Sequence, residues 1–159
     1  MNEWLNLIFL DIDGVLNSHR KLKEVYERTH KPHSGYNYPF DEICLSNLKD
    51  LVELTNSKIV ITSSWRKDEE GRNTIIKAVK EYELDQHIIE YTPILHQPRG
   101  IEIQEYLNQL DYEPNFIILD DDTDMDHLID YLVKTSIAVG LTKENVDEAI
   151  IKLTKKRTQ

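Results

Sequence analysis

Cysteine is almost absent from this chain of 159 residues. Its one cysteine, Cys44, excludes an internal disulfide and a zinc site built from several cysteines. A free thiol is typical of a reducing compartment. Because Cys44 lies among apolar residues of a predicted helix, we expect a small core residue rather than a nucleophile.

Long hydrophobic runs are also missing, and no segment approaches the length needed to cross a bilayer. The first residues, MNEWLNLIFLDIDG, lack the cationic start and the cleavage site of a signal peptide. We therefore expect a cytoplasmic protein without a membrane partner. With 40% apolar and 30% charged residues, the chain has the composition of a globular protein, and its length suits one domain over residues 1–159.

Positive charge is in short supply, since the formal net charge is -10. This balance argues against broad, non-specific binding to nucleic acid. The exception is the segment 17–40, where five basic and two acidic residues give +3 and leave -13 for the remainder. With Pro32, Gly35 and Pro39 it reads as an irregular stretch, which is long for a loop and hence either functional or mobile.

Apolar segments and helical patterns alternate along the chain. The predicted strands are residues 7–10, 58–62, 88–91, 116–119 and 136–139. Most are uninterrupted apolar runs, which indicates strands covered on both faces. Patterns with helical spacing fall near residues 41–52, 75–82, 103–110, 128–132 and 146–153. This alternation predicts a doubly wound α/β fold with a parallel sheet, whose ligands bind at the carboxyl ends of the strands.

Polar side chains follow three of these strands where each ends. The set comprises Asp11 and Asp13, then Ser63, Ser64 and Arg66, then Asp120, Asp121, Asp122 and Asp124. Two carboxylates about 4 Å apart repel by about 4 kcal/mol at an effective dielectric near 20, so such a cluster needs a cation. Oxygen ligands favour a hard divalent ion, most simply Mg²⁺, which suits phosphoryl transfer.

The acidic residues have two other interpretations. The run from Asp120 to Asp124 is also compatible with capping of a following helix. An EF-hand calcium loop is excluded, because its sixth and twelfth positions require Gly and Glu. Counted from Asp120 these positions are Met125 and Tyr131, and counted from Asp11 they are Leu16 and Leu22.

Four segments together resemble a known superfamily. FLDIDGVL, IVITSS, PRGIEI and FIILDDD look like the four motifs of haloacid dehalogenase (HAD) phosphatases, in the right order. SSWR, the TP before RG, and GLTKENVDEAI are most similar to the HAD domain of Swiss Army Knife RNA repair proteins. The resemblance implies a three-layer α/β/α HAD-like (Rossmannoid) fold, with a five-stranded parallel sheet and residues 17–40 as a minimal cap.

The resemblance also implies roles for single residues. Asp11 is expected as the nucleophile and Asp13 as the general acid and base, with Asp11, the Asp13 carbonyl and Asp121 on Mg²⁺ and Asp120 in support. Ser63 matches the second-motif hydroxyl, although Thr62 is one position away and is an alternative. Arg99 stands where the family usually has lysine, and the two are not interchangeable. Substrate contacts are further expected from Thr62, Ser64, Arg66 and Lys21, with an ordinary helix-start arginine as an equal alternative for Arg66.

We therefore expect a Mg²⁺-dependent phosphomonoester hydrolase that forms an aspartyl-phosphate. A short cap leaves the site open to a bulky substrate, and basic and aromatic side chains in residues 17–40 can grip a polynucleotide 3′-end. A solvated flap is the alternative for that segment. The alternative enzyme is a nucleotide or small-metabolite phosphatase, and the alternative of another class is a catalytically silent metal-binding module. No protein partner is inferred.

Overall fold

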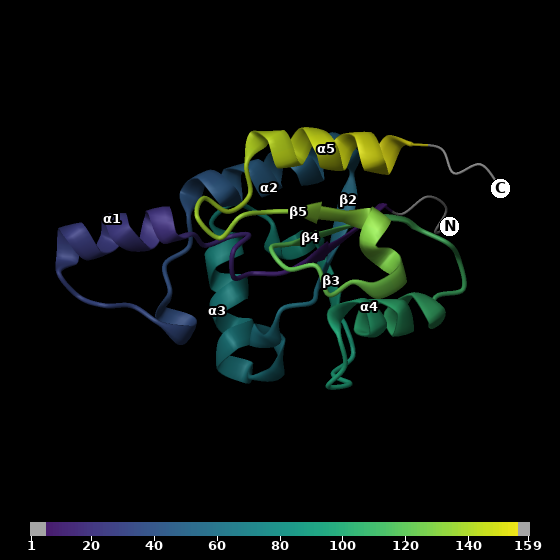
Figure 1. Ribbon diagram of the computed structural model, residues 1–159, viewed down its shortest axis with the longest axis horizontal. Coiled ribbons are helices and arrows are strands. Elements are labelled where there is room, and N and C mark those ends of the chain that lie inside the picture. Colours follow the sequence, from purple (N-terminus) through teal and green to yellow (C-terminus); the bar gives the residue numbers. More distant parts are fainter. Residues whose placement is uncertain (1–5, 156–159) are drawn as a thin grey trace.

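A parallel sheet with β1 at its centre organises the molecule. The computed structural model describes residues 6–155. The strands are β1 (Asn6–Leu10), β2 (Ser57–Ile61), β3 (Ile88–Tyr91), β4 (Asn115–Asp120) and β5 (Leu132–Lys134). Their order across the sheet is β3-β2-β1-β4-β5, and every pair is parallel. The predicted doubly wound α/β fold is therefore confirmed (Figure 1).

Helices cover both faces of the sheet. The helices are α1 (His19–Thr29), α2 (Glu42–Thr55), α3 (Glu69–Lys80), α4 (Arg99–Asn108) and α5 (Lys143–Thr154). Short 3₁₀ turns are η1 (Gly35–Asn37), η2 (Ser64–Lys67), η3 (Asp85–His87) and η4 (Asp126–Tyr131). Within residues 6–155, no helix has both the length and the apolar character that crossing a bilayer requires.

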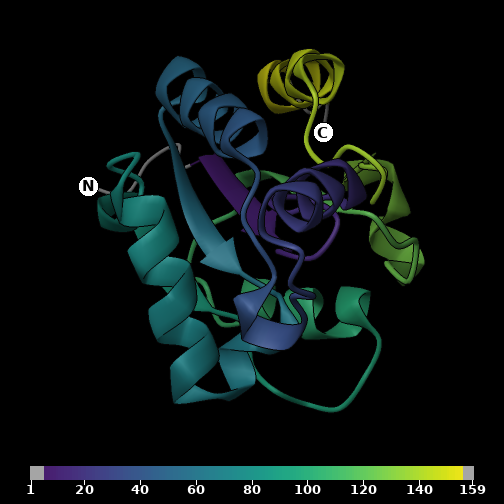
Figure 2. The ribbon, with the colours of Figure 1, turned by 90° about the vertical axis from the view of Figure 1, so that its left-hand side faces the viewer.

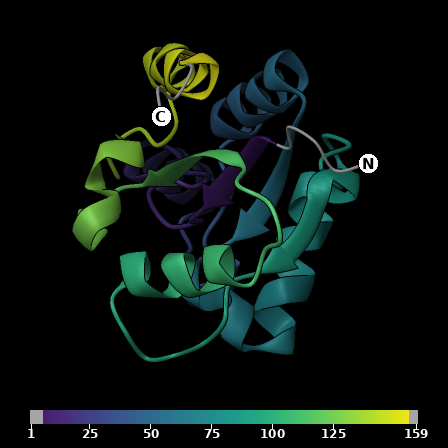
Figure 3. The ribbon, with the colours of Figure 1, turned by 90° about the vertical axis from the view of Figure 1, so that its right-hand side faces the viewer.

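Successive residues of each strand point to opposite faces, and this alternation creates two apolar cores. Ile8 and Leu10 belong to one core, together with side chains of α2, α3 and α5 and the fully buried Cys44. Leu7 and Phe9 belong to the other, which α4 and η4 complete. Figure 3 shows α4 and α5 on opposite sides of the sheet. The three central strands β1, β2 and β4 are thus buried on both faces, as their uninterrupted apolar runs predicted, whereas Ile89 in the edge strand β3 is 44% exposed.

The fifth strand lies earlier in the chain than the sequence indicated. Residues 136–139 form a turn, and residues 128–132, which were predicted to be helical, divide between η4 and β5. Leu132 and Val133 are buried beside β4, with Leu119 opposite Val133, whereas Ile137 is 39% exposed. The strand was misplaced, and the predicted helix is a 3₁₀ helix that ends at Tyr131. Two apolar runs lie close together, and only pairing with β4 decides which one enters the sheet.

The segment 17–40 has more regular secondary structure than predicted, because α1 occupies its first half. Ser18 caps this helix by accepting the backbone N–H of Lys21, and His30 ends it in the left-handed conformation. The backbone N–H groups of His19 and Arg20 donate to Ile137 and Ala138 in the turn that replaced the expected strand. Figure 1 shows α1 and the loop after it projecting beyond one end of the sheet, and in Figure 2 this end of the molecule faces the viewer.

Candidate active site

The sheet brings together the ends of β1, β2 and β4. Leu10 lies opposite Ile61 on one side and Leu119 on the other. The ladder continues one step further, since the N–H of Asp11 donates to Leu119 (3.0 Å) and that of Thr62 to Leu10 (2.9 Å). The residues that follow these strands therefore lie side by side, although the sequence separates them by more than fifty positions. The edge is the one expected to bind ligands in such sheets.

Three aspartates form a cluster at this edge. Oxygen atoms of Asp11, Asp120 and Asp121 all lie within 4.8 Å of one another. Asp11 is 7% exposed and Asp120 is 1% exposed. Burial raises the pKa of Asp11, and the carboxylate of Asp121 adds to this rise. Burial and the neighbouring Asp11 raise the pKa of Asp120 to about 8. Burial thus favours the protonated forms of Asp11 and Asp120 until a cation balances the cluster.

One cation is supplied by the chain itself. A single nitrogen of Arg99, Nη1, lies 2.8 Å from Asp120 and 3.3 Å from Asp11. The same nitrogen donates to the hydroxyl of Thr62 at 3.2 Å. Burial lowers the pKa of Arg99, but the charges of Asp11 and Asp120 outweigh it and the net shift is upward. The guanidinium therefore stays charged and offsets part of the negative charge.

Gly100 fixes the approach of Arg99, a role that the sequence reasoning did not assign. Arg99 begins α4, and the next residue packs directly on the loop after β4. A methyl group at Gly100 would lie 2.0 Å from the carbonyl oxygen of Met125. The N–H of Gly100 donates to the carbonyl of Asp124 at 3.0 Å. The sequence shows a glycine after PR, but only the fold shows that a larger residue there would collide with the backbone of Met125.

Asp13 occupies a separate position from the acidic cluster. Its side chain is exposed, and among residues 6–155 its carboxylate is not part of the group that could hold a metal. Its two oxygens accept hydrogen bonds from Asn17 Nδ2 (2.8 Å) and Trp65 Nε1 (3.1 Å). That Asp13 offers a metal its main-chain carbonyl and keeps its carboxyl group for proton transfer stays a prediction.

The hydroxyl groups after β2 point to different partners. Thr62 is fully buried, and its hydroxyl accepts from Arg99. Ser63 is 1% exposed, and its hydroxyl accepts the backbone N–H of Trp65 at 3.2 Å, where it caps η2. Ser64 is exposed in η2. The geometry thus brings Thr62, rather than Ser63, into contact with the charged groups of the site.

Arg66 is committed to the protein. Its guanidinium donates to four backbone carbonyls and one carboxylate, so all five of its N–H groups have acceptors. These acceptors are Thr62, Ser63, Thr92 and Pro93 through their carbonyls, and Glu102 through its side chain. Arg66 is 3% exposed. Burial lowers its pKa, while Glu102 opposes this shift. The geometry favours a structural role over the predicted phosphate contact.

Lys21 also has protein partners in place of a free ammonium group. Its Nζ lies 2.7 Å from Glu42 and 3.1 Å from Glu24. Hydrogen bonding to Glu42 raises the pKa of Lys21. The predicted substrate contact would require Lys21 to leave both carboxylates. Lys23 on α1 is more available than Lys21, since its side chain is 79% exposed and its ion pair with Glu27 is long, at 3.9 Å.

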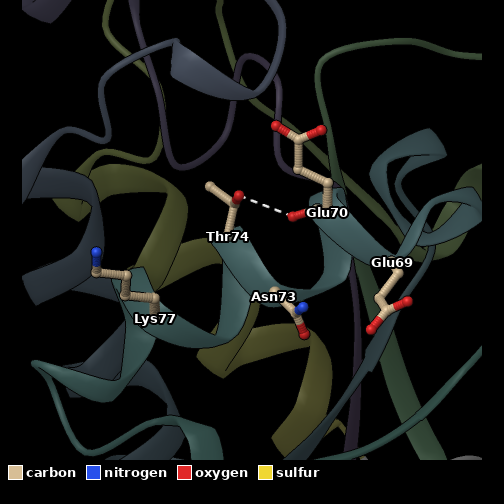
Figure 4. A pocket seen from close by; sticks show the side chains of 5 residues that line it. All are labelled: Glu69, Glu70, Asn73, Thr74 and Lys77. Atoms are coloured by element: carbon tan, nitrogen blue, oxygen red, sulfur yellow. Dashed lines mark hydrogen bonds between the residues drawn. The ribbon is translucent and has the colours of Figure 1, made fainter.

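A hollow elsewhere on the surface lacks the positive charge that a phosphate site needs. It has a volume of about 470 Å³ and lies along α3, where it is lined by Glu69, Glu70, Asn73, Thr74 and Lys77. Figure 4 shows these side chains on a single helix, with Thr74 donating to the backbone carbonyl of Glu70. Two glutamates beside one lysine would repel a phosphate group. The α3 hollow is therefore not a competing phosphate site.

Comparison with protein families agrees with this geometry. The family described as "HAD domain in Swiss Army Knife RNA repair proteins" matches residues 7–146, which include the three strand ends and Arg99. No curated protein and no solved structure matches the chain. Because the family match covers most of the sequence, the chain belongs to the HAD domains found in Swiss Army Knife RNA repair proteins.

Proposed function

We propose that this protein is a Mg²⁺-dependent phosphomonoester hydrolase that acts through an aspartyl-phosphate on Asp11. The observation that carries the proposal is Arg99 Nη1 lying between Asp11 and Asp120 and donating to Thr62, beside Asp121. A carboxylate, a hydroxyl and a guanidinium meet there in a sheltered site. Membership of a HAD family supports a phosphatase-type reaction.

The side chains fit a divalent cation. Three carboxylates and one guanidinium leave an excess of two negative charges, and all the available ligand atoms are oxygens, as Mg²⁺ prefers. Asp11 and Asp121 would hold the ion together with the main-chain carbonyl of Asp13, and Asp120 would support them. When bound, Mg²⁺ neutralises the non-bridging oxygens of the phosphoryl group.

Asp11 and Asp13 divide the chemistry between them. A carboxylate oxygen of Asp11 forms a bond to phosphorus while the ester P–O bond breaks, and the departing alcohol oxygen takes the proton of Asp13. Water then attacks the aspartyl-phosphate and gives a proton back to Asp13 as the bond to Asp11 breaks. The products are the alcohol and inorganic phosphate, and both aspartates return to their starting forms.

Thr62 is the second-motif hydroxyl in this proposal. Its hydroxyl accepts a hydrogen bond from Arg99 Nη1, the same nitrogen that pairs with Asp11. The hydroxyl of Ser63 instead accepts the backbone N–H of Trp65. Thr62 and Arg99 together offer donors to the phosphoryl oxygens. Lys21 and Arg66 contribute through the protein structure instead.

A polynucleotide 3′-end is the substrate class that we propose. The family name refers to RNA repair, and the segment 17–40, whose net charge is +3 in a chain of net charge -10, lies beside the open edge (Figure 1). A hollow of about 390 Å³ between α1 and the following loop is lined by His19, Leu22, Lys23, Tyr26, Pro32 and His33. Tyr26 is 50% exposed there. Exposed aromatic and basic groups together suit the bases and phosphates of a single strand.

The test compares substrates and variants. Wild type with Mg²⁺ should release phosphate from p-nitrophenyl phosphate, and Asp11→Asn should lose this activity by about 100-fold or more. Asp130→Asn, an exposed aspartate in η4, is the matched control and should retain it. Equal rates for wild type and Asp11→Asn would contradict the nucleophile.

The substrate class is tested separately. A 3′-phosphorylated oligonucleotide should have a higher kcat/KM than a 3′-mononucleotide, and Lys23→Glu should reduce this preference. Lys80→Glu, which changes an exposed lysine on α3, serves as the control. A mononucleotide that reacts equally well would favour the nucleotide or small-metabolite phosphatase.

A further inference from the structure

The carboxylate of Asp13 is held by two side chains that the proposed chemistry leaves unused. Asn17 Nδ2 donates to Oδ1 at 2.8 Å, and Trp65 Nε1 donates to Oδ2 at 3.1 Å. One donor therefore sits on each oxygen, which defines the plane of the carboxyl group. Each oxygen keeps a further acceptor position that can carry or receive a proton.

Both donors are themselves buried and held by neighbouring groups of the protein. Asn17 is 1% exposed, and its Oδ1 accepts the backbone N–H of Gly14 at 2.9 Å. Trp65 is 4% exposed, so its indole ring cannot lie against a substrate. An exposed aspartate usually samples several rotamers, but these two fixed donors favour one orientation.

The indole is in turn held by the loop that follows α1. The ring centroid of Trp65 lies 5.1 Å from that of Tyr36 and 5.6 Å from that of Phe40, and both contacts are edge to face. Such contacts favour a defined ring orientation. The hydroxyl of Tyr36 donates to Asp68, the residue before α3. At Gly71 on α3, a methyl group would lie 2.2 Å from the Trp65 carbonyl oxygen and 2.9 Å from the Tyr36 ring, so glycine permits this packing.

We infer that Trp65 and Asn17 are positioning residues for Asp13, and that the rings of Tyr36 and Phe40 make the orientation of Asp13 depend on the loop after α1. The inference rests on the proposed function, in which Asp13 gives a proton to the leaving oxygen. Proton transfer requires the acid within hydrogen-bond reach of that oxygen, so an acid that rotates freely is less effective.

The decisive variant is Trp65→Phe, which keeps an aromatic ring but removes the N–H donor. The assay compares kcat/KM for two substrates. A 3′-phosphorylated oligonucleotide releases a sugar hydroxyl and needs the proton of Asp13, whereas p-nitrophenolate is a stable anion that leaves without one. Because kcat/KM reports the steps up to the first irreversible one, it isolates the transfer to Asp11. We expect a loss of about 10-fold or more for the oligonucleotide and less than about 3-fold for p-nitrophenyl phosphate.

Two further variants separate positioning from folding. Replacement of Trp65 by β-(3-benzothienyl)alanine keeps the bicyclic shape and loses only the N–H, and it should reproduce the selective loss. Tyr106→Phe removes a polar atom from a buried aromatic residue in the other core and should leave the ratio of the two kcat/KM values unchanged. Equal losses for both substrates, or no loss, in the benzothienyl variant would overturn the inference.

The contact is also tested without turnover. In ¹⁵N-labelled protein, the indole N–H resonance of Trp65 should shift on Asp13→Ala, because its acceptor is removed. An unshifted resonance would overturn the inference even in an active enzyme. A wild type that hydrolyses neither substrate would instead contradict the proposed function, while this resonance would still report on the contact.

Discussion

A carboxylate oxygen of Asp121 lies only 2.4 Å from the position that a methyl group on Gly14 would occupy. Gly14 has a φ of +79°, which side chains rarely adopt. Glycine at this position therefore permits two features. The chain can turn directly after Asp13, and Asp121 can approach closely enough to form one carboxylate cluster with Asp11. The second requirement links two motifs more than a hundred residues apart.

Gly14→Ala should weaken the site more than it weakens the fold. The new methyl group displaces Asp121, so we expect a smaller rise in melting temperature on addition of Mg²⁺ and a large loss of phosphatase activity. Gly35→Ala is a matched control, because Gly35 has a φ of +57° but nothing within 4 Å of the added methyl group. Both should lose about 1–2 kcal/mol of stability from the left-handed backbone. An equal response of the two variants to Mg²⁺ would contradict the link between Gly14 and Asp121.

Substitutions at Thr62 and Ser63 should have different consequences. Thr62→Val removes the hydroxyl next to Arg99, and we expect kcat/KM to fall about 10- to 100-fold, while Thr62→Ser retains most activity. Ser63→Ala removes the acceptor for the backbone N–H of Trp65. It should lower the free energy of unfolding by about 1 kcal/mol and change kcat/KM less than Thr62→Val does. Steady-state kinetics and urea unfolding measure the two effects. The reverse pattern would restore Ser63 as the second-motif hydroxyl.

Arg66→Lys should reduce the stability of the protein. Lysine cannot replace five hydrogen bonds, and it leaves Glu102 imperfectly paired in a buried site. We expect a loss of about 3 kcal/mol or more in urea unfolding. Arg28→Lys, on the exposed side of the last turn of α1, is the control and should change stability little. Unchanged stability together with a raised KM would instead support the substrate contact predicted for Arg66.

Asp41 should make stability depend on pH in the acid range. Burial raises the pKa of Asp41, but hydrogen bonds from Ser18 and Arg20 outweigh it and lower the pKa below 3.8. The stabilisation is therefore present above pH 3.8 and is lost as pH falls through the lower pKa of the folded state. Asp41→Asn should cost about 1–2 kcal/mol at neutral pH. Urea unfolding between pH 7 and pH 3 should show this difference shrinking with acid, and a constant difference would contradict it.

Much of the fold could be predicted because its signals are local. The apolar runs of β1 to β4 each consist of consecutive residues, and their bounds agree with the structure within about two positions. The helix α1 was not predicted, although Ser18, Leu22 and Val25 have helical spacing, because Pro32 and Gly35 indicated an irregular segment. The fifth strand was misplaced because residues 132–134 and 136–139 compete, and only the neighbour β4 chooses between them.

Local sequence indicates the kind of site: paired aspartates after a buried strand, hydroxyls after the next, an arginine and a further acidic run, all in an order typical of HAD domains. Tertiary structure decided which of these groups meet. It brought Arg99 to both Asp11 and Thr62. It also paired Arg66 and Lys21 with carbonyls and carboxylates of the protein, and placed the indole N–H of Trp65 on Asp13. The reason is physical, since hydrogen-bond partners far apart in sequence depend on packing and cannot be read from local periodicity.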